Sequence, residues 1–441
     1  MKDKIIKLKN GGVLIYSKTK LNNCSAVEVG FLAGANLDKK PGTAHFLEHS
    51  LFKKTKNRTN AEVEKDRNKI AILNASTGMD YLVVRFFRTN KLINESLEFA
   101  SDILLNSVLD DEYVESEKGV IKEELNMTID DEERDVYVLN GMQAISHAKY
   151  SSDIVGGKAE NIDKIKFKDI KAFKDKNFNG NNFICSIKTS MPLAKTKRFI
   201  NKYFVDKIPF DKDYKKPKTY YEKTNVDKKS SLRIYRREKE KKSVVLMSFK
   251  LNANEFDIYG KNYNYTFLAR YLSGSQGDLF LKLRNLGLIY RISADISTLN
   301  KSSLFNIVFE TSREKIKPTI DIISEEIKKV VYVKIDEHLI EEYKKNIEYY
   351  EDERMPAKLG SICHTNLMDY VCFGKLFKLT KKERKELKNG VNSEEVMKIA
   401  KEIFNKNNEM FVTVLGNATK SNVPSFESFK NKFLVSEWVY G

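Results

Sequence analysis

The chain has 441 residues, more than one hydrophobic core usually organises, so we expect two domains. Apolar residues make up 41% of the sequence and charged residues 32%, and this balance excludes an intrinsically disordered protein. The formal net charge is +17, but the lysines are spread along the chain and interleaved with acidic residues, as in Glu238-Lys239-Glu240. This pattern favours a solvated surface and no nucleic-acid partner.

The N-terminal segment and the cysteines bear on the cellular compartment. Residues 1–9 mix charged and aliphatic side chains, and no apolar run reaches the length of a signal sequence or a membrane span. The four cysteines, at positions 24, 185, 363 and 372, lie far apart and form no Cys-x-x-Cys pair. We therefore expect a cytoplasmic protein with free thiols and no membrane partner.

The first half of the chain mixes strands and helices. A hairpin is expected across Asn10-Gly11-Gly12, and Thr59 followed by Glu62 predicts a capping box at the start of a helix. The expected elements are strands at 3–9, 13–17 and 25–33, a helix at 43–53, a helix through the sixties, strands at 70–77 and 79–88, helices from 92 to 147 and a strand from 183. This half closes near residue 205.

The second half repeats the order of the first. Residues 206–231 are polar, lysine-rich and without helical period, so they predict a linker. The expected elements of residues 232–441 are a strand at 243–251, helices near 258–286, strands at 288–297 and 303–310, several helices and a strand at 409–415. We therefore expect an internal duplication of an α+β unit with antiparallel pairing, with residues 1–205 as the N-terminal domain.

The helix expected at 43–53 carries the pattern His45-Phe-Leu-Glu48-His49. Two histidines four residues apart lie on one helix face, at a separation that a single zinc ion can span, and Glu48 shares that face. Hydrolysis needs a metal that acidifies bound water and a carboxylate that accepts the proton, so Glu48 is the candidate general base. The corresponding residues of the second half, 257–261, contain no histidine, so only the N-terminal domain can hold the metal.

A third zinc ligand must come from another segment, because a catalytic zinc usually keeps three protein ligands and one open position. The helix around 113–126 offers Glu124, and Glu117 lies two turns earlier on the same face, where it can support the site from behind a ligand. Glu123 points elsewhere. With five histidines in the chain, the His-x-x-Glu-His pattern arises by chance in roughly a few chains per thousand, so we expect one zinc ion per chain.

Two segments resemble the motifs of a known family. Gly42-Thr-Ala-His-Phe-Leu-Glu-His49, with Leu51-Phe-Lys53 and Arg58-Thr59 after it, resembles the signature helix of the inverzincin zinc metallopeptidases. This is the family of pitrilysin, insulin-degrading enzyme and the mitochondrial processing peptidase. Gly119-Val-Ile-Lys-Glu-Glu124 resembles the segment around the family's third ligand.

The resemblance implies roles for five residues. Three are implied as zinc ligands, namely His45, His49 and Glu124. Glu48 takes the place of the general base, and Glu117 matches the family's additional acidic residue in the catalytic site.

The resemblance also implies two substrate-binding elements. Leu73-Asn-Ala-Ser-Thr77 is similar to the family's edge strand, to which a peptide adds as a further strand, so Asn74 and Ala75 are expected to bind substrate. By chemistry alone Asn74 is equally a turn residue. Arg284, before a glycine C-cap, and Tyr290, on the outgoing strand, resemble the family's Arg/Tyr pair, which holds substrate carbonyls or helps to stabilise the oxyanion. Without the resemblance, Arg284 is more simply a surface or capping residue.

From this resemblance, the chain is expected to form two homologous α/β-sandwich domains that make half of a clamshell. Because the chain has both the metal motif and the Arg/Tyr pair, two copies of it suffice to form the complete clamshell, and we expect a homodimer. The expected function is zinc-dependent endoproteolysis of short or unfolded peptides in an enclosed chamber. The alternatives are a noncatalytic or partner-dependent subunit of a processing-peptidase-like heterodimer, against which the intact Glu48 argues, and a nucleic-acid-binding protein, which the charge pattern disfavours.

Overall fold

The computed structural model describes residues 3–21, 23–70, 73–129, 132–145, 155–254, 257–258, 262–350, 358–377 and 379–435. They fall into two compact units. Unit 1 comprises residues 1–127, 153–222 and 352–378, and unit 2 comprises residues 128–152, 223–351 and 379–441. Residues 71–72, 130–131, 146–147 and 259–261, for which the sequence makes predictions, lie outside the described residues.

Unit 1 contains a six-stranded sheet in the order β1-β2-β6-β3-β5-β4. Its strands are β1 (Lys4–Lys7), β2 (Val13–Lys18), β3 (Cys24–Phe31), β4 (Asn74–Thr77), β5 (Leu82–Thr89) and β6 (Phe183–Thr189). Strands β2 and β6 are parallel, and the other neighbours are antiparallel. The expected hairpin is confirmed, because β1 and β2 pair across a turn in which Gly11 has a φ of +86°.

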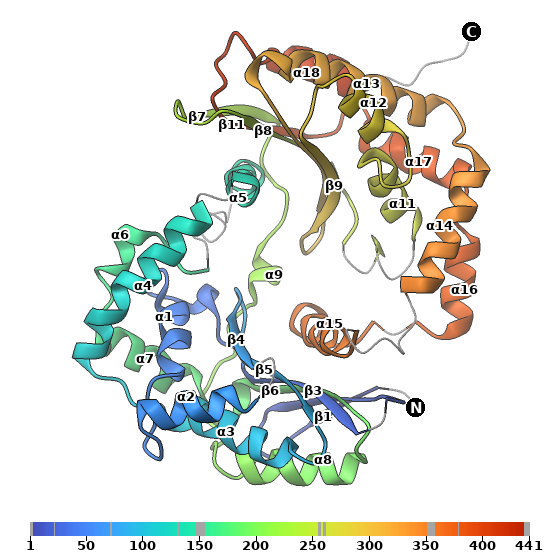
Figure 1. The fold of residues 1–441 in the computed structure, drawn as a ribbon. Helices are drawn as coiled ribbons and strands as arrows, with labels where there is room; N and C mark the ends of the chain where they lie inside the picture. Colours follow the sequence, from blue (N-terminus) through green and yellow to red (C-terminus); the bar gives the residue numbers. More distant parts are fainter. Residues whose placement is uncertain are drawn as a thin grey trace. The chain divides into compact units, whose positions relative to one another are not determined.

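Helices cover both faces of this sheet (Figure 1). They are η1 (Ala35–Leu37), α1 (Thr43–Leu51), α2 (Asn60–Asn68), α3 (Ile93–Asn106), α4 (Asp111–Ile129), α6 (Ala159–Ile162), α7 (Phe167–Asn177), η2 (Gly180–Asn182), α8 (Leu193–Ile200), η3 (Asn201–Val205), α9 (Tyr220–Lys223) and α15 (Lys358–Phe373). The main core lies between one face and helices that include α1, α3 and α7. The opposite face is covered by α15, which contacts β2, β3 and β6.

Unit 2 contains a five-stranded sheet in the order β7-β11-β8-β10-β9. Its strands are β7 (Ser231–Arg236), β8 (Ser243–Leu251), β9 (Arg291–Thr298), β10 (Ser303–Thr311) and β11 (Met410–Gly416). Strands β7 and β11 are parallel, and the other neighbours are antiparallel. Strand β7 was not expected, because its side chains are only half-buried at the edge of the sheet and its sequence is as polar as the preceding linker.

The helices of unit 2 also lie on both faces of its sheet. They are α5 (Glu132–Ala144), α11 (Asn264–Leu272), α12 (Leu279–Asn285), η4 (Arg313–Lys315), α13 (Ile316–Tyr332), α14 (Glu337–Tyr350), α16 (Lys381–Asn389), α17 (Ser393–Ile403) and α18 (Phe426–Phe433). Helices α11 to α14, α17 and α18 contribute to the main core. Helix α5 packs on the other face, against β8 and β11 (Figure 1).

The two units repeat one topology and exchange a helix. Strands β2, β6, β3, β5 and β4 of unit 1 correspond in order and direction to β7, β11, β8, β10 and β9 of unit 2. In each unit the helix on the second face comes from the other half of the sequence, α15 in unit 1 and α5 in unit 2. The units therefore differ from the contiguous domains 1–205 and 232–441 that the sequence suggested, because a helix packs on whichever sheet its apolar face fits.

The helices near the predicted site agree with the sequence. The capping box at Thr59 and Glu62 is present at the start of α2, and the helix expected at 43–53 is α1.

Among the described residues, no helix combines the length and the hydrophobicity that a membrane crossing requires.

Candidate metal centre

Helix α1 begins after Gly42, where another backbone segment approaches closely and a carboxylate caps the first turn. Gly42 has a φ of +93°, and a Cβ there would lie 2.3 Å from the carbonyl oxygen of Gly156. The Asp38 carboxylate accepts hydrogen bonds from the backbone N–H groups of Gly42 and Ala44, each at 2.9 Å. The buried apolar side chains of α1 pack into the core of unit 1 and leave the half-buried histidines on another face.

Three predicted ligands converge in unit 1. One potential ligand atom from each of His45, His49 and Glu124 lies within 4.8 Å of the others. The Nε2 atoms of His45 and His49 lie 3.7 and 3.1 Å from carboxylate oxygens of Glu124. Tetrahedral ligands about 2.0–2.1 Å from a zinc ion are roughly 3.4 Å apart, so small side-chain rotations would allow all three residues to hold one ion. Two imidazoles and a carboxylate fit zinc chemically.

Glu117 orients one of the histidines. It is only 6% exposed, and its carboxylate lies 3.0 Å from Nδ1 of His49 and 3.4 Å from Nζ of Lys53. A proton on Nδ1 bonded to Glu117 leaves the Nε2 lone pair of His49 free for a metal. Lys53 lies just beyond the end of α1, and its role was not predicted from the sequence.

The charges of the site perturb its titration. Burial opposes protonation of His49, but the hydrogen bond with Glu117 and the charge of Glu124 outweigh it and raise the pKa of the imidazole. Burial likewise opposes ionisation of Glu117, but His49 and Lys53 lower the pKa of its carboxyl. The His45 imidazole, against the effect of burial, lowers the pKa of Glu124 to about 2. The two acids are therefore carboxylates at neutral pH, as metal ligation requires.

His45 is packed tightly against a glycine. Its Nδ1 is buried and has no hydrogen-bond partner among the described residues. A Cβ added to Gly156 would lie 3.0 Å from that atom and 2.6 Å from Cδ2 of Leu125. The imidazole therefore presents Nε2 to Glu124, and the glycine gives it the space to do so.

Glu48 is held from a neighbouring strand. Thr77, the last residue of β4, donates a hydrogen bond from Oγ1 to Oε2 of Glu48 at 2.6 Å. Thr77 ends the Leu73–Thr77 motif, but its role was not predicted from the sequence. Its signal was the alternation of the strand, because Thr77 shares a face with the buried Ala75 and so points toward the helix side of the sheet.

The proposed substrate strand is an edge of the sheet. Among the described strands, β4 pairs only with β5, through Asn74 opposite Arg85 and Ala75 opposite Val84. Asn74 is exposed, and its Oδ1 accepts a hydrogen bond from the backbone N–H of Ala75 at 2.9 Å. The Ala75 side chain is buried in the core, so this residue offers only its backbone to a partner.

Arg284 and Tyr290 lie in unit 2, away in the sequence from the other predicted residues. Helix α12 ends in a Schellman motif, in which Leu288 N–H donates to Leu283 O and Gly287, with a φ of +64°, donates to Arg284 O, both at 2.9 Å. Nη1 of Arg284 lies 3.4 Å from the carbonyl oxygens of Ile289 and Tyr290. Tyr290 is 59% exposed, and it immediately precedes β9.

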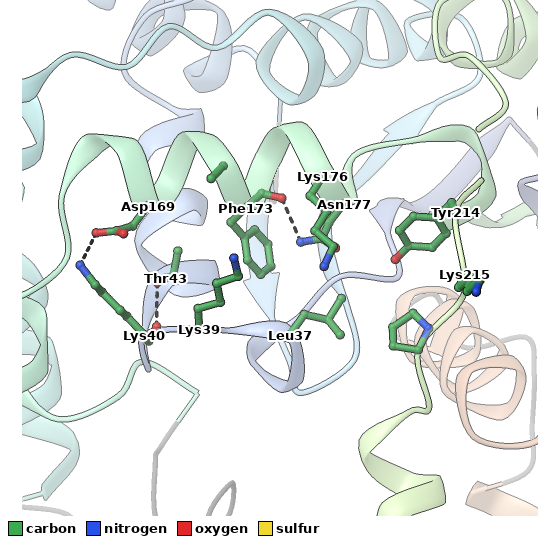
Figure 2. A pocket seen from close by; sticks show the side chains of 12 residues that line it. Leu37, Lys39, Lys40, Thr43, Asp169, Phe173, Lys176, Asn177, Tyr214 and Lys215 are labelled. Atoms are coloured by element: carbon green, nitrogen blue, oxygen red, sulfur yellow. Dashed lines mark hydrogen bonds and ion pairs between the residues drawn. The ribbon is translucent and has the colours of Figure 1, made fainter. Parts of the chain in front are cut away.

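A separate cavity of about 250 Å³ lies beside the first turn of α1. Lys40 and Asp169 pair at one end of it and Tyr214 lies at the other (Figure 2). Thr43 and Phe173 contribute to its lining, and none of the predicted site residues does.

Two family models match the sequence. The model of the Insulinase family (Peptidase family M16) matches residues 13–153, and the model of the Peptidase M16 inactive domain matches residues 164–347. Together the two matches cover most of the chain and include every predicted site residue.

The similarity extends to individual proteins. The mitochondrial-processing peptidase subunit beta of Saccharomyces cerevisiae is 31% identical over 207 residues, which are 45% of this chain and 43% of the yeast protein. The match thus spans less than half the length of this relative. A protease from Helicobacter pylori has a TM-score of 0.79 at 20% identity, covering 94% of this chain and 99% of that chain. A peptidase M16 inactive domain from Pseudomonas fluorescens has a TM-score of 0.78 at 13% identity, covering 96% and 100%. These two structures show a shared fold.

Proposed function

Because the chain belongs to the insulinase family of peptidases, M16, we propose that it is a zinc-dependent endopeptidase acting on short or unfolded peptides. The observation that carries the proposal is the group of His45, His49 and Glu124, whose ligand atoms lie within 4.8 Å of one another. Glu48 lies on the same helix between the two histidines. A metal site with an adjacent carboxylate is the arrangement that metal-dependent peptide hydrolysis uses.

In this proposal His45, His49 and Glu124 hold one zinc ion, and Glu117 supports them. When bound, zinc supplies a Lewis acid that polarises the scissile carbonyl and acidifies water. The Glu117 carboxylate, 3.0 Å from Nδ1 of His49, fixes the tautomer of that ligand. Lys53 offsets the negative charge of Glu117 from the other side, at 3.4 Å.

Glu48 serves as the general base. Its carboxylate accepts a proton from the attacking water and returns it to the amine that leaves when the peptide bond breaks. The hydrogen bond from Thr77 occupies Oε2, and this leaves Oε1 to receive the proton.

The peptide binds by adding a strand to the free edge of β4. The exposed Asn74 and the backbone of Ala75 supply the pairing groups, after the Asn74 side chain releases the Ala75 N–H. Backbone pairing gives affinity with little dependence on the peptide sequence. Arg284 and Tyr290 bind substrate carbonyls or the oxyanion, and in this role the exposed Tyr290 hydroxyl and the Arg284 guanidinium are the donors.

A homodimer is the proposed assembly, because one chain carries both the metal motif and the Arg/Tyr pair. A second candidate is a noncatalytic or partner-dependent subunit of a heterodimer, since one matching model is that of an inactive domain and the yeast relative is one subunit of a processing peptidase. Light scattering of the purified protein distinguishes a dimer from a monomer that awaits a partner.

A cytoplasmic location completes the proposal. None of the four cysteines, all of which lie among the described residues, forms a disulfide, and burial raises the pKa of the Cys363 thiol to about 12, so this group stays protonated and unreactive. Free thiols are typical of a reducing compartment. Cell fractionation tests this part of the proposal.

The decisive experiment is hydrolysis of a quenched-fluorescence peptide library by the purified protein. Cleavage should require zinc, disappear with a chelator, and be lost by Glu48→Gln while zinc is still bound at one ion per chain. Cleavage by Glu48→Gln at the wild-type rate would contradict the role of Glu48. A zinc-loaded dimer that cleaves no peptide would favour the noncatalytic alternative.

A further inference from the structure

Thr77 connects the edge strand of unit 1 to the proposed base. Its hydroxyl donates to Oε2 of Glu48 at 2.6 Å, which is the length of a strong hydrogen bond to a carboxylate. Thr77 is half-buried, so the bond is partly shielded from competing water. Glu48 has two further rotatable bonds beyond Cβ, and a second contact from another element restricts them.

The end of β4 is fixed firmly enough to aim this hydroxyl. Thr77 pairs with Leu82 on β5, and the side chain of Ala75, on the same face, is 5% exposed within the core. After Thr77 the chain turns at Gly78, whose N–H donates to Tyr81 O at 2.8 Å and whose carbonyl accepts from Ala35 N–H at 3.0 Å. A shift of the strand by one residue would turn Thr77 to the opposite face.

We propose that Thr77 is a positioning residue, which orients the Glu48 carboxylate and couples it to the strand on which the peptide adds. This inference rests on the proposed peptidase function. General base catalysis depends on the carboxylate lying within hydrogen-bond reach of the water proton. Loss of the hydroxyl frees Glu48 to occupy other rotamers, and each of these lowers the fraction of enzyme ready to react.

The coupling predicts which kinetic constant changes. Asn74 and the Ala75 backbone are the proposed peptide-binding groups, whereas the Thr77 side chain contacts the base, on the face opposite to the Asn74 side chain. Removal of the hydroxyl should therefore lower kcat and leave KM nearly unchanged. Zinc binding should not change, because the Thr77 hydroxyl bonds to Glu48, which is not one of the three proposed ligands.

The test compares Thr77→Val, which keeps the shape and removes the hydroxyl, with Thr77→Ser, which keeps the hydroxyl. Thr298→Val is a matched control, because Thr298 is the last residue of β9, an edge strand of the other sheet, and is also half-buried. For each protein, kcat, KM, zinc stoichiometry and Tm are measured with one peptide that the wild type cleaves. If Thr77→Val does not fold, Thr77→Ala provides the same comparison.

Thr77→Val should lower kcat about tenfold, a part of the 10²–10⁴-fold effect of a general base, with KM within about twofold of wild type. Thr77→Ser and Thr298→Val should stay within about threefold of the wild-type kcat. Full kcat in zinc-loaded Thr77→Val, or equal losses in the valine and serine variants, would overturn the inference while the peptidase function stands. A wild-type protein that cleaves nothing contradicts the proposed function, and the inference falls with it.

Discussion

Glu117 and Glu124 have different surroundings although both lie on one face of α4. Glu124 is exposed and approaches both histidines, whereas Glu117 is buried and lies beside Nδ1 of His49 and Nζ of Lys53. The two residues lie two helical turns apart on this face, so they cannot occupy the same place beside the histidines. Glu124 is placed to act as a ligand, and Glu117 is placed to contact a ligand from behind.

Glu117→Gln should weaken zinc binding about 10–100-fold, the usual effect of losing a carboxylate that orients a metal-bound histidine. The amide keeps the size of the side chain but loses the charge that raises the pKa of His49 and fixes its tautomer. Competition with a chromophoric chelator at neutral pH measures the zinc Kd. Glu123→Gln is the control, since Glu123 is exposed on the same helix and should bind zinc like the wild type. Unchanged zinc affinity in Glu117→Gln would show that Glu117 does not support the ligand.

The site residues differ in how far sequence could predict them. Spacing on two helices predicts four of them, namely His45, Glu48, His49 and Glu124. In a helix, the number of residues between two side chains determines whether they share a face. The role of Thr77 depends on how close β4 lies to α1 in the fold, and residue spacing within the sequence does not predict that distance. Gly156 is a similar case, since its importance lies in the space that it leaves beside His45.

At the scale of elements, a polar cluster joins α3 to the loop between α1 and α2. Asp102 of α3 is 2% exposed. It accepts hydrogen bonds from Thr55 at 2.7 Å, Asn57 at 2.5 Å and Arg58 at 2.6 Å. Burial opposes ionisation of Asp102, but these bonds outweigh it and hold the pKa of its carboxyl below the ordinary value. The loop that follows the metal-binding helix is thereby tied to the core.

Asp102→Asn should lower the free energy of unfolding by about 2 kcal/mol at neutral pH, because it removes the most buried of the three carboxylates that pair with Arg58 and weakens a charged hydrogen bond. The pKa of Asp102 is lower in the folded state than in the unfolded chain. The wild type therefore has the full contribution above the unfolded pKa, near 3.9, and loses it as the pH falls through the folded pKa. The difference between the two proteins should shrink on acidification below about pH 4.

Urea unfolding of both proteins over a series of pH values measures this difference. Asp213→Asn, at an exposed position, serves as the control and should follow the wild type throughout. A difference between wild type and Asp102→Asn that stays constant down to pH 3 would mean that ionisation of Asp102 contributes nothing to the effect.

Elements were predicted well where their signal is local. The capping box of α2, the glycine turn between β1 and β2, and the glycine that ends α12 each specify backbone geometry within a few residues. Strand β7 carried no such signal. It forms because β11 offers a parallel edge to residues 231–236, a partner that lies far along the chain.

At the scale of the molecule, the exchange of α5 and α15 could not be predicted from hydrophobic periodicity. Leu359, Cys363, Leu367 and Val371 recur every four residues and are buried, so they indicate a helix with one apolar face. This periodicity identifies the apolar face of the helix, but it does not identify the sheet against which that face packs. Helix α5 adds a polar signal, since Asn140 donates to Ser248 of β8 at 2.7 Å, but that pairing too becomes visible only in the fold.

The exchange predicts that a core mutation late in the sequence will loosen the unit that holds the metal ligands. Leu367 is fully buried against Val13, Ile15 and Ile184 of unit 1. Leu367→Ala should destabilise the protein by about 2–5 kcal/mol, through lost burial and a cavity. Ile399→Ala is the matched control, because Ile399 is 3% exposed in the core of unit 2.

Hydrogen exchange, followed strand by strand, distinguishes the two outcomes. In Leu367→Ala the amides of β2 and β6 should exchange faster while those of β8 and β11 keep their protection, and Ile399→Ala should give the reverse. We expect the zinc Kd to rise in Leu367→Ala and not in Ile399→Ala, because α1 packs on the sheet that Leu367→Ala loosens. If Leu367→Ala instead loosens β8 and β11, residues 358–373 belong with their own half of the sequence, and the exchange of helices is wrong.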